Sequence, residues 1–136
     1  MRLGSKSRRR AGAAVVEMAV VLPLFILLVF GLIEASRLGM VAQLITNAAR
    51  EGCRVAVINQ TTQAAVQARV EAVLAGSGIS VGTVNPSPSN WATSSKGTAI
   101  TVSLSVPFSQ VSWLSTPMFL GNTTVSASAT MSSERP

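Results

Sequence analysis

The longest pattern in the chain is an apolar run near its beginning. Residues 18–33 carry no charge, and the wider segment 15–36 contains charged side chains only at Glu17 and Glu34. As a helix these 22 residues would extend about 33 Å, at roughly 1.5 Å per residue, which is enough to cross a bilayer core of about 30 Å. We therefore expect a transmembrane helix over residues 13–36.

The helical pattern continues beyond this run. Small or apolar side chains recur three or four residues apart, opposite a polar row of the same spacing; the first row is Val41, Ile45, Ala48 and Gly52, and the second is Gln43, Asn47, Arg50 and Arg54. This pattern is typical of a helix with one face on a domain. We expect one helix over residues 13–58, kinked near residues 19–23 because Pro23 removes a backbone donor.

The period then changes from helical to alternating. A second helix is predicted for residues 62–75, with Thr62 at its start and Gly76 and Gly78 closing it. Apolar and hydroxylated residues alternate over 100–106 and 124–131, which indicates two half-buried strands, and residues 79–84 form a weaker third strand. Residues 85–97 form a loop, and residues 108–122 form a connection with a helical turn. The predicted fold is α+β: a long membrane helix, a short second helix and a three-stranded antiparallel sheet.

Charge is concentrated at the N-terminus. Residues 1–12 hold five of the eleven cations and no acid, so most of the net charge of +6 comes from this leader. Few positive charges follow the apolar run, and the positive-inside rule therefore places the N-terminus in the cytoplasm and residues 37–136 outside it. Nucleic-acid binding is not expected, because no basic face with interleaved aromatic residues follows the leader.

The composition excludes most catalytic chemistry. The chain has no His and no Asp, which rules out Ser-His-Asp and Cys-His arrangements, and its five glutamates do not recur in close pairs. The single cysteine, Cys53, cannot form a disulfide within the chain or supply a zinc site. We expect no enzyme activity, metal, cofactor or small-molecule substrate. Cys53 is interpreted as a packing residue, with pairing between chains as the alternative.

Glu17 is the anomalous residue of the apolar segment. A carboxylate costs roughly 2.5–3.5 kcal/mol at a bilayer centre and less near its edge, so we expect it to have a use. Gly12, five residues earlier, follows the basic leader, and this Gly-x4-Glu arrangement resembles the class III signal of type IV pilins. The resemblance implies that a membrane peptidase cuts between Gly12 and Ala13, and that Glu17 then faces the new amine of a neighbouring subunit. Two alternatives stay open: an ordinary secretory signal cut near residues 33–35, and an uncut anchor whose Glu17 snorkels to the interface.

Two further sets of residues are candidates for subunit contacts. Gly31, Ala35 and Gly39 lie four residues apart and would allow another helix to approach closely, although small residues are also common in membrane spans. Arg50, Glu51 and Arg54 form either a solvated helix face or an electrostatic docking edge.

Two blocks of the sequence resemble the TadE-like pseudopilins of tight-adherence (Flp) pilus systems. They are residues 11–36, AGAAVVEMAVVLPLFILLVFGLIEAS, followed by Arg37, and residues 46–54, TNAAREGCR. Met18 and Cys53 depart from the residues usual in that family.

The resemblance implies a non-enzymatic, pilin-like subunit in assembly of a type IVb (Flp-type) adhesive pilus. An aspartic prepilin peptidase would process it, and its partners would be other pilin-like subunits and an assembly platform driven by an ATPase. It would reside in the bacterial inner membrane as a single-pass protein or enter a surface pilus. The alternative function is a membrane-anchored binding module with an uncut N-terminus.

Overall fold

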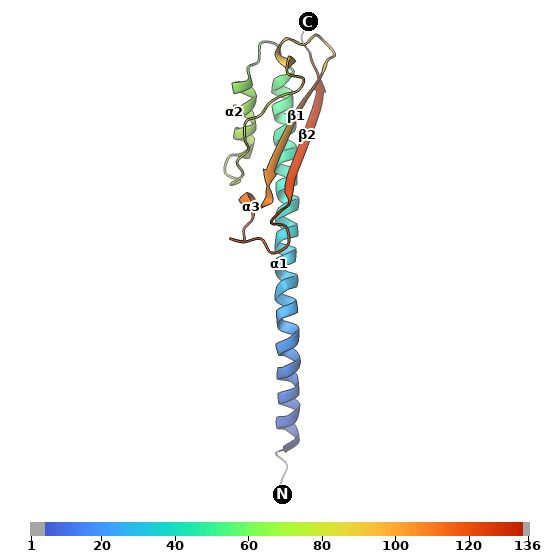
Figure 1. Cartoon of the computed structure of the whole chain (residues 1–136), viewed down its shortest axis with the longest axis vertical. Helices are drawn as coiled ribbons and strands as arrows, with labels where there is room; N and C mark the ends of the chain where they lie inside the picture. Colours follow the sequence, from blue (N-terminus) through green and yellow to red (C-terminus); the bar gives the residue numbers. More distant parts are fainter. Residues whose placement is uncertain (1–4, 135–136) are drawn as a thin grey trace. The chain divides into compact units, whose positions relative to one another are not determined.

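The computed structural model describes residues 5–134, and side chains from residue 12 onward. The elements follow in the order α1 (Ser5–Ala56), α2 (Gln63–Leu74), a 3₁₀ turn (Trp91–Thr93), β1 (Ala99–Pro107), α3 (Phe108–Val111) and β2 (Thr124–Ser132) (Figure 1). The chain divides into two compact units, Met1–Ile33 and Glu34–Pro136. Most side chains of the predicted basic leader lie outside the described residues.

The first unit consists of the N-terminal part of α1. The helix begins at Ser5, earlier than predicted, and it continues through Pro23 without interruption. Its large apolar side chains from Val15 to Leu28 and at Leu32 are between about 40 % and 70 % exposed. By length and composition α1 is able to cross a membrane, and it is the only helix among residues 5–134 with that property.

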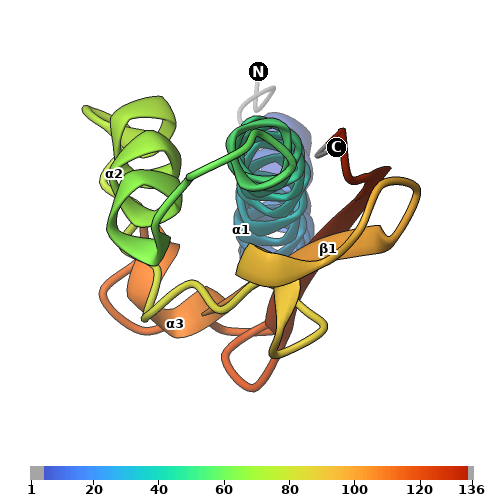
Figure 2. The ribbon, with the colours of Figure 1, turned by 90° about the horizontal axis from the view of Figure 1, so that it is seen from above.

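The core of the second unit forms around residues 34–56 of α1. This part of the helix buries one stripe of mostly small side chains: Val41, Ile45, Ala48, Ala49, Cys53 and Ala56. Gly52 lies at the closest approach, since a Cβ atom there would be 2.7 Å from Val70 Cγ2 on α2 and 3.5 Å from Val102 Cγ1 on β1. Viewed from above, α2 and β1 flank this part of α1 (Figure 2). Small residues thus let three elements meet on one stripe.

The predicted second helix is confirmed to within one residue at each end. Thr62 is the N-cap, and its side chain accepts a hydrogen bond from the Ala65 N–H at 3.3 Å. After Leu74 the chain turns at Gly76 and Gly78, whose φ angles of +76° and +72° are readily adopted by glycine. The helix buries Val66, Val70 and Leu74.

The two stronger strands are also confirmed. β1 and β2 pair antiparallel over nine residues each, from Ala99 opposite Ser132 to Pro107 opposite Thr124. The alternation sorts their side chains as predicted: Ile100, Val102, Leu104 and Val106 are buried, while the intervening hydroxylated residues are largely exposed. The helical turn expected within 108–122 is α3, which buries Phe108 and Val111.

The predicted third strand is wrong, because the sheet among the described residues has two strands. Glutamine side chains of α2 form hydrogen bonds with the backbone N–H and carbonyl of Val84. In a strand these groups would be bonded to a neighbouring strand instead. The Val84 N–H donates to Gln67 Oε1 at 2.8 Å, and its carbonyl accepts from Gln63 Nε2 at 3.1 Å. The free edge of β1 has one isolated bridge instead, in which Ser87 and Thr101 exchange two hydrogen bonds of 2.8 Å.

Candidate functional site

The exposed helix carries Gly12 and Ala13, predicted to flank the cleavage site, and Glu17, predicted for subunit association. All three are exposed, and Glu17 makes no hydrogen bond or ion pair with the residues whose side chains are described. Its surroundings on the helix are apolar and equally exposed. A carboxylate in such a position can accept a partner from another molecule without first losing one of its own.

The residues predicted for subunit contacts differ in accessibility. Ala35 and Gly39 are exposed, and Gly31 is half-buried. Arg50 and Arg54 are exposed as well, as a docking edge requires. Glu51 has a different role, because its carboxylate forms an ion pair with Arg69 of α2, with Arg69 Nη2 2.7 Å from Glu51 Oε2. The hydrogen bond from Arg69 lowers the pKa of Glu51.

Glu34 is the principal residue that the sequence pattern did not reveal. It is the first residue of the second unit, its side chain is 1 % exposed, and its carboxylate accepts three backbone hydrogen bonds. The donors are the N–H groups of Met118, Phe119 and Leu120; the last two lie 3.0 and 2.9 Å from Oε2, and the first binds Oε1. Three donors converging on one carboxylate offset the loss of its hydration.

Arg37 lies one turn further along α1 and is also buried, at 6 % exposure. Its Nε donates to the Val111 carbonyl at 2.7 Å, and its Nη2 donates to the Ser77 carbonyl at 3.4 Å. The guanidinium carbon lies 5.0 Å from the centre of the Trp113 ring, a cation–π distance. No ion pair joins Arg37 to Glu34 among the described residues, so each charge is satisfied separately.

Together Glu34 and Arg37 hold the loop that connects α3 to β2. We call residues 112–123 the connecting loop. Glu34 fixes its second half through backbone groups, and Arg37 fixes the segment where it begins. Trp113, Met118 and Phe119 of this loop remain more than half exposed. One signal in the sequence pointed here, namely a charged residue directly after the uncharged run and a second one helical turn later, but nothing local identified their partners.

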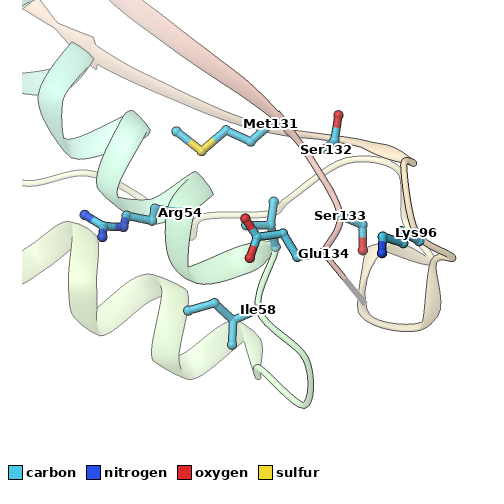
Figure 3. A pocket seen from close by; sticks show the side chains of 8 residues that line it. Arg54, Ile58, Lys96, Met131, Ser132, Ser133 and Glu134 are labelled. Atoms are coloured by element: carbon cyan, nitrogen blue, oxygen red, sulfur yellow. The ribbon is translucent and has the colours of Figure 1, made fainter. Parts of the chain in front are cut away.

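The end of the second unit away from Glu34 along α1 contains a cavity of about 1000 Å³. It is lined by Arg54, Val57, Ile58, Lys96, Met131, Ser132, Ser133 and Glu134. Figure 3 shows Arg54, Lys96 and Glu134 around it, contributed by α1, the loop before β1 and the segment after β2. Charges of both signs line it, and the described residues contain no group of three His, Cys, Asp or Glu side chains able to hold a metal.

Cys53 is buried in the core, as its interpretation as a packing residue requires. Its side chain is 0 % exposed, and its thiol donates to the Ile100 carbonyl with a distance of 3.2 Å between the heavy atoms. Burial raises the pKa of this thiol above its ordinary value. The thiol is therefore protonated at neutral pH and inaccessible to a second chain.

Comparison with known families identifies the helical part of the chain. Residues 12–54 match the family model described as TadE-like protein. This is a TadE-like segment. It begins at Gly12 and contains Glu17, Glu34, Arg37 and Cys53, whereas α2 and the sheet follow it. The resemblance inferred from the sequence is thereby confirmed.

The TadE-like family is associated with assembly of Tad (Flp) pili, and its members are generally non-catalytic components. No match was found among curated proteins or solved structures. The matched residues cover the exposed apolar part of α1 with its one carboxylate, Glu17, and the part of α1 that belongs to the second unit.

Proposed function

We propose that this chain is a pseudopilin that anchors in the inner membrane through α1 and takes part in assembly of a Tad (Flp) pilus. The observation that carries the proposal is Glu17, an exposed carboxylate without a described partner on an apolar helix, in a TadE-like segment that begins at Gly12. The chain would comprise a leader (1–12), a membrane helix (13–36) and an outer domain (37–136), with its N-terminus in the cytoplasm because the leader is basic.

Cleavage between Gly12 and Ala13 is the first step of the proposed function. Hydrolysis of this peptide bond by a prepilin peptidase leaves a charged α-amine on Ala13 and removes five cations that would resist extraction from the membrane. Glu17 then becomes the fifth residue of the mature chain. In a low-dielectric environment the amine of one subunit and the carboxylate of another attract strongly, and each needs the other to offset its desolvation.

Processing can be tested with Gly12→Val, co-expressed with the cognate peptidase. We expect the variant to keep its leader, because the peptidase reads the residue before the scissile bond. Gly82→Val is the matched control, since Gly82 is exposed and a Cβ there meets nothing within 4 Å. Intact-mass measurement distinguishes the forms. A native protein that keeps residues 1–12 would instead favour the alternative function, a membrane-anchored binding module.

Association can be tested separately with Glu17→Leu. The substitution lowers the cost of membrane insertion, so the variant should remain membrane-bound and folded while pilus assembly fails. Glu71→Leu, at an exposed position of α2, should assemble normally. Wild-type amounts of pili or of crosslinked subunits in Glu17→Leu would show that the carboxylate only snorkels to the interface.

A further inference from the structure

The connecting loop gathers most of the exposed large apolar side chains of the second unit. Among residues 34–134 five such side chains are exposed, and three of them belong to this loop: Trp113 at 60 %, Met118 at 52 % and Phe119 at 58 %. A fourth, Met40, lies on α1 and contacts Arg37, whose Nη1 is 3.3 Å from Met40 Sδ. Arg37 contacts Met40 and Trp113, and Glu34, one turn earlier on α1, binds the backbone of Met118 and Phe119. We call these four apolar residues the aromatic loop surface.

The structure holds this surface in place. The N–H groups of Met118 and Phe119 are bound to Glu34, and the Trp113 ring lies against Arg37. Hydrogen bonds to a charged group are the stronger kind, so the backbone cannot easily turn these side chains toward the core. Exposed apolar clusters on an ordered surface are a mark of an interaction site.

The position of the loop along the chain identifies its surroundings. Glu34 directly follows Ile33, the last residue of the uncharged run, so a spanning α1 places Glu34 at the level of the lipid headgroups. The backbone of Met118 and Phe119 is hydrogen-bonded to this carboxylate and must lie at nearly the same depth. The chain carries no charge from Gly97 to Ser133. Aromatic side chains are favoured at this level of a bilayer, and a charge-free loop meets little cost in entering it.

We propose that Trp113, Met118 and Phe119 insert into the lipid interface of the leaflet next to the second unit, with Met40 beside them. The loop would then be a second membrane contact, in addition to the helix. The partner is the phospholipid bilayer itself, because the loop is bonded to the residue at which the apolar run ends. The inference rests on the proposed membrane anchoring of α1.

The chain has two tryptophans, which allows a direct test. Trp91 is buried at 7 % exposure and Trp113 is exposed, so Trp91→Phe isolates the loop and Trp113→Phe isolates the core. The full chain would be placed in vesicles of phosphatidylethanolamine and phosphatidylglycerol that contain phospholipids brominated either near the carbonyl or near the end of the acyl chain. We expect Trp113 emission to be shifted to the blue and quenched several-fold more by the shallow bromine than Trp91 emission. If Trp91→Phe does not fold, the difference between the wild type and Trp113→Phe gives the same quantity.

Three outcomes would overturn the inference. Trp113 emission that is quenched by aqueous acrylamide but not by brominated lipid would place the loop in water. Blue-shifted emission that brominated lipid does not quench, and that moves to the red on dilution into more lipid, would indicate a contact between subunits. Failure of the chain to float with the vesicles would contradict membrane anchoring and the loop contact together, whereas flotation without quenching contradicts the loop contact alone.

Discussion

The two parts of α1 differ in the size and the exposure of their apolar side chains. Up to Ile33 the helix displays large side chains, leucine, valine, isoleucine and phenylalanine, and most of them are exposed. From Glu34 onward it turns small side chains such as Ala48, Ala49 and Gly52 toward α2 and the sheet. Hydropathy and side-chain size both separate these regions, since residues 18–33 carry no charge whereas residues 34–56 include two glutamates and three arginines. The small side chains of the second region let other backbones approach α1.

The two glutamates of the helix make the same contrast. Glu17 is exposed on an apolar surface and makes no described contact, while Glu34 is buried and accepts three hydrogen bonds. The charge of Glu34 is therefore satisfied within the molecule, whereas for Glu17 we propose a partner on another molecule. The predictions below test this division.

The largest effect is expected from a charge in the core of the second unit. Val102 is 0 % exposed, and Val102→Glu would bury an unpaired carboxylate there. A core of this size is expected to provide only about 5 kcal/mol, and the substitution should remove most of it. Ser103→Glu, on the exposed face of the same strand, should be nearly silent. Equal urea midpoints of the two variants in detergent would show that the buried face is wrongly assigned.

A smaller effect on the free energy of unfolding is expected from alanine at two glycines of α1, one closely packed and one open. Gly52→Ala and Gly39→Ala both gain about 0.5–1 kcal/mol of helix preference. At Gly39 nothing lies within 4 Å of the new Cβ, so the free energy of unfolding should rise by about that amount. At Gly52 the Cβ would meet the stiff Val70 side chain, and overpacking of about 1–3 kcal/mol should lower it. A stabilising Gly52→Ala would contradict the close packing of α1 and α2.

Glu34→Gln should have a local effect. The amide keeps the shape of the carboxylate but has one acceptor oxygen, whereas the three backbone N–H groups bind two oxygens in the wild type. Exchange of the backbone amides of residues 118–120 should accelerate, on the order of tenfold or more, as followed by hydrogen exchange in micelles. Glu17→Gln should leave the same amides unchanged. Protection that survives Glu34→Gln would mean that the connecting loop is held without its charge.

The smallest effect concerns pH. Burial raises the pKa of Cys53 in the folded chain, so the folded state keeps this proton at pH values where the unfolded state releases it. The contribution is fully present below the unfolded pKa and is lost as the pH rises beyond it. Stability should therefore decline slightly above about pH 9, the ordinary range of a thiol. Cys53→Ala should be less stable near neutral pH because it leaves a cavity, and the difference in urea midpoint between it and the wild type should narrow above about pH 9.

Local patterns were sufficient to predict much of the fold. The alternation at Ile100, Val102 and Leu104 assigns the buried face of β1 correctly, since a strand with one covered face has only one such solution. Thr62 likewise marks the start of α2. The third strand was wrong because Gln63 and Gln67, at least seventeen residues away, bind the backbone at Val84, and no local pattern records such a contact.

The candidate site was predicted less completely. Glu17 was recognised because the free-energy cost of a carboxylate in a membrane-spanning apolar run is evident without knowledge of its partners. Glu51 was grouped with its neighbours on the helix, yet it pairs with Arg69, eighteen residues later. Glu34 was not recognised because its partners are backbone N–H groups, which every residue except proline offers and which therefore leave no trace in the sequence.

The separation in sequence between Glu34 and its hydrogen-bond donors has a consequence during synthesis. The three N–H groups lie 84 to 86 residues after Glu34, so most of the chain must be made before they exist. Chains are made from the N-terminus, and until residue 118 has emerged none of the three donors is available to the carboxylate. If α1 inserts into the membrane as proposed, a hydrated charge at position 34 would during that interval oppose movement of the apolar run deeper into lipid. The same residue would thus limit insertion before its hydrogen bonds to residues 118–120 hold the connecting loop in the folded chain.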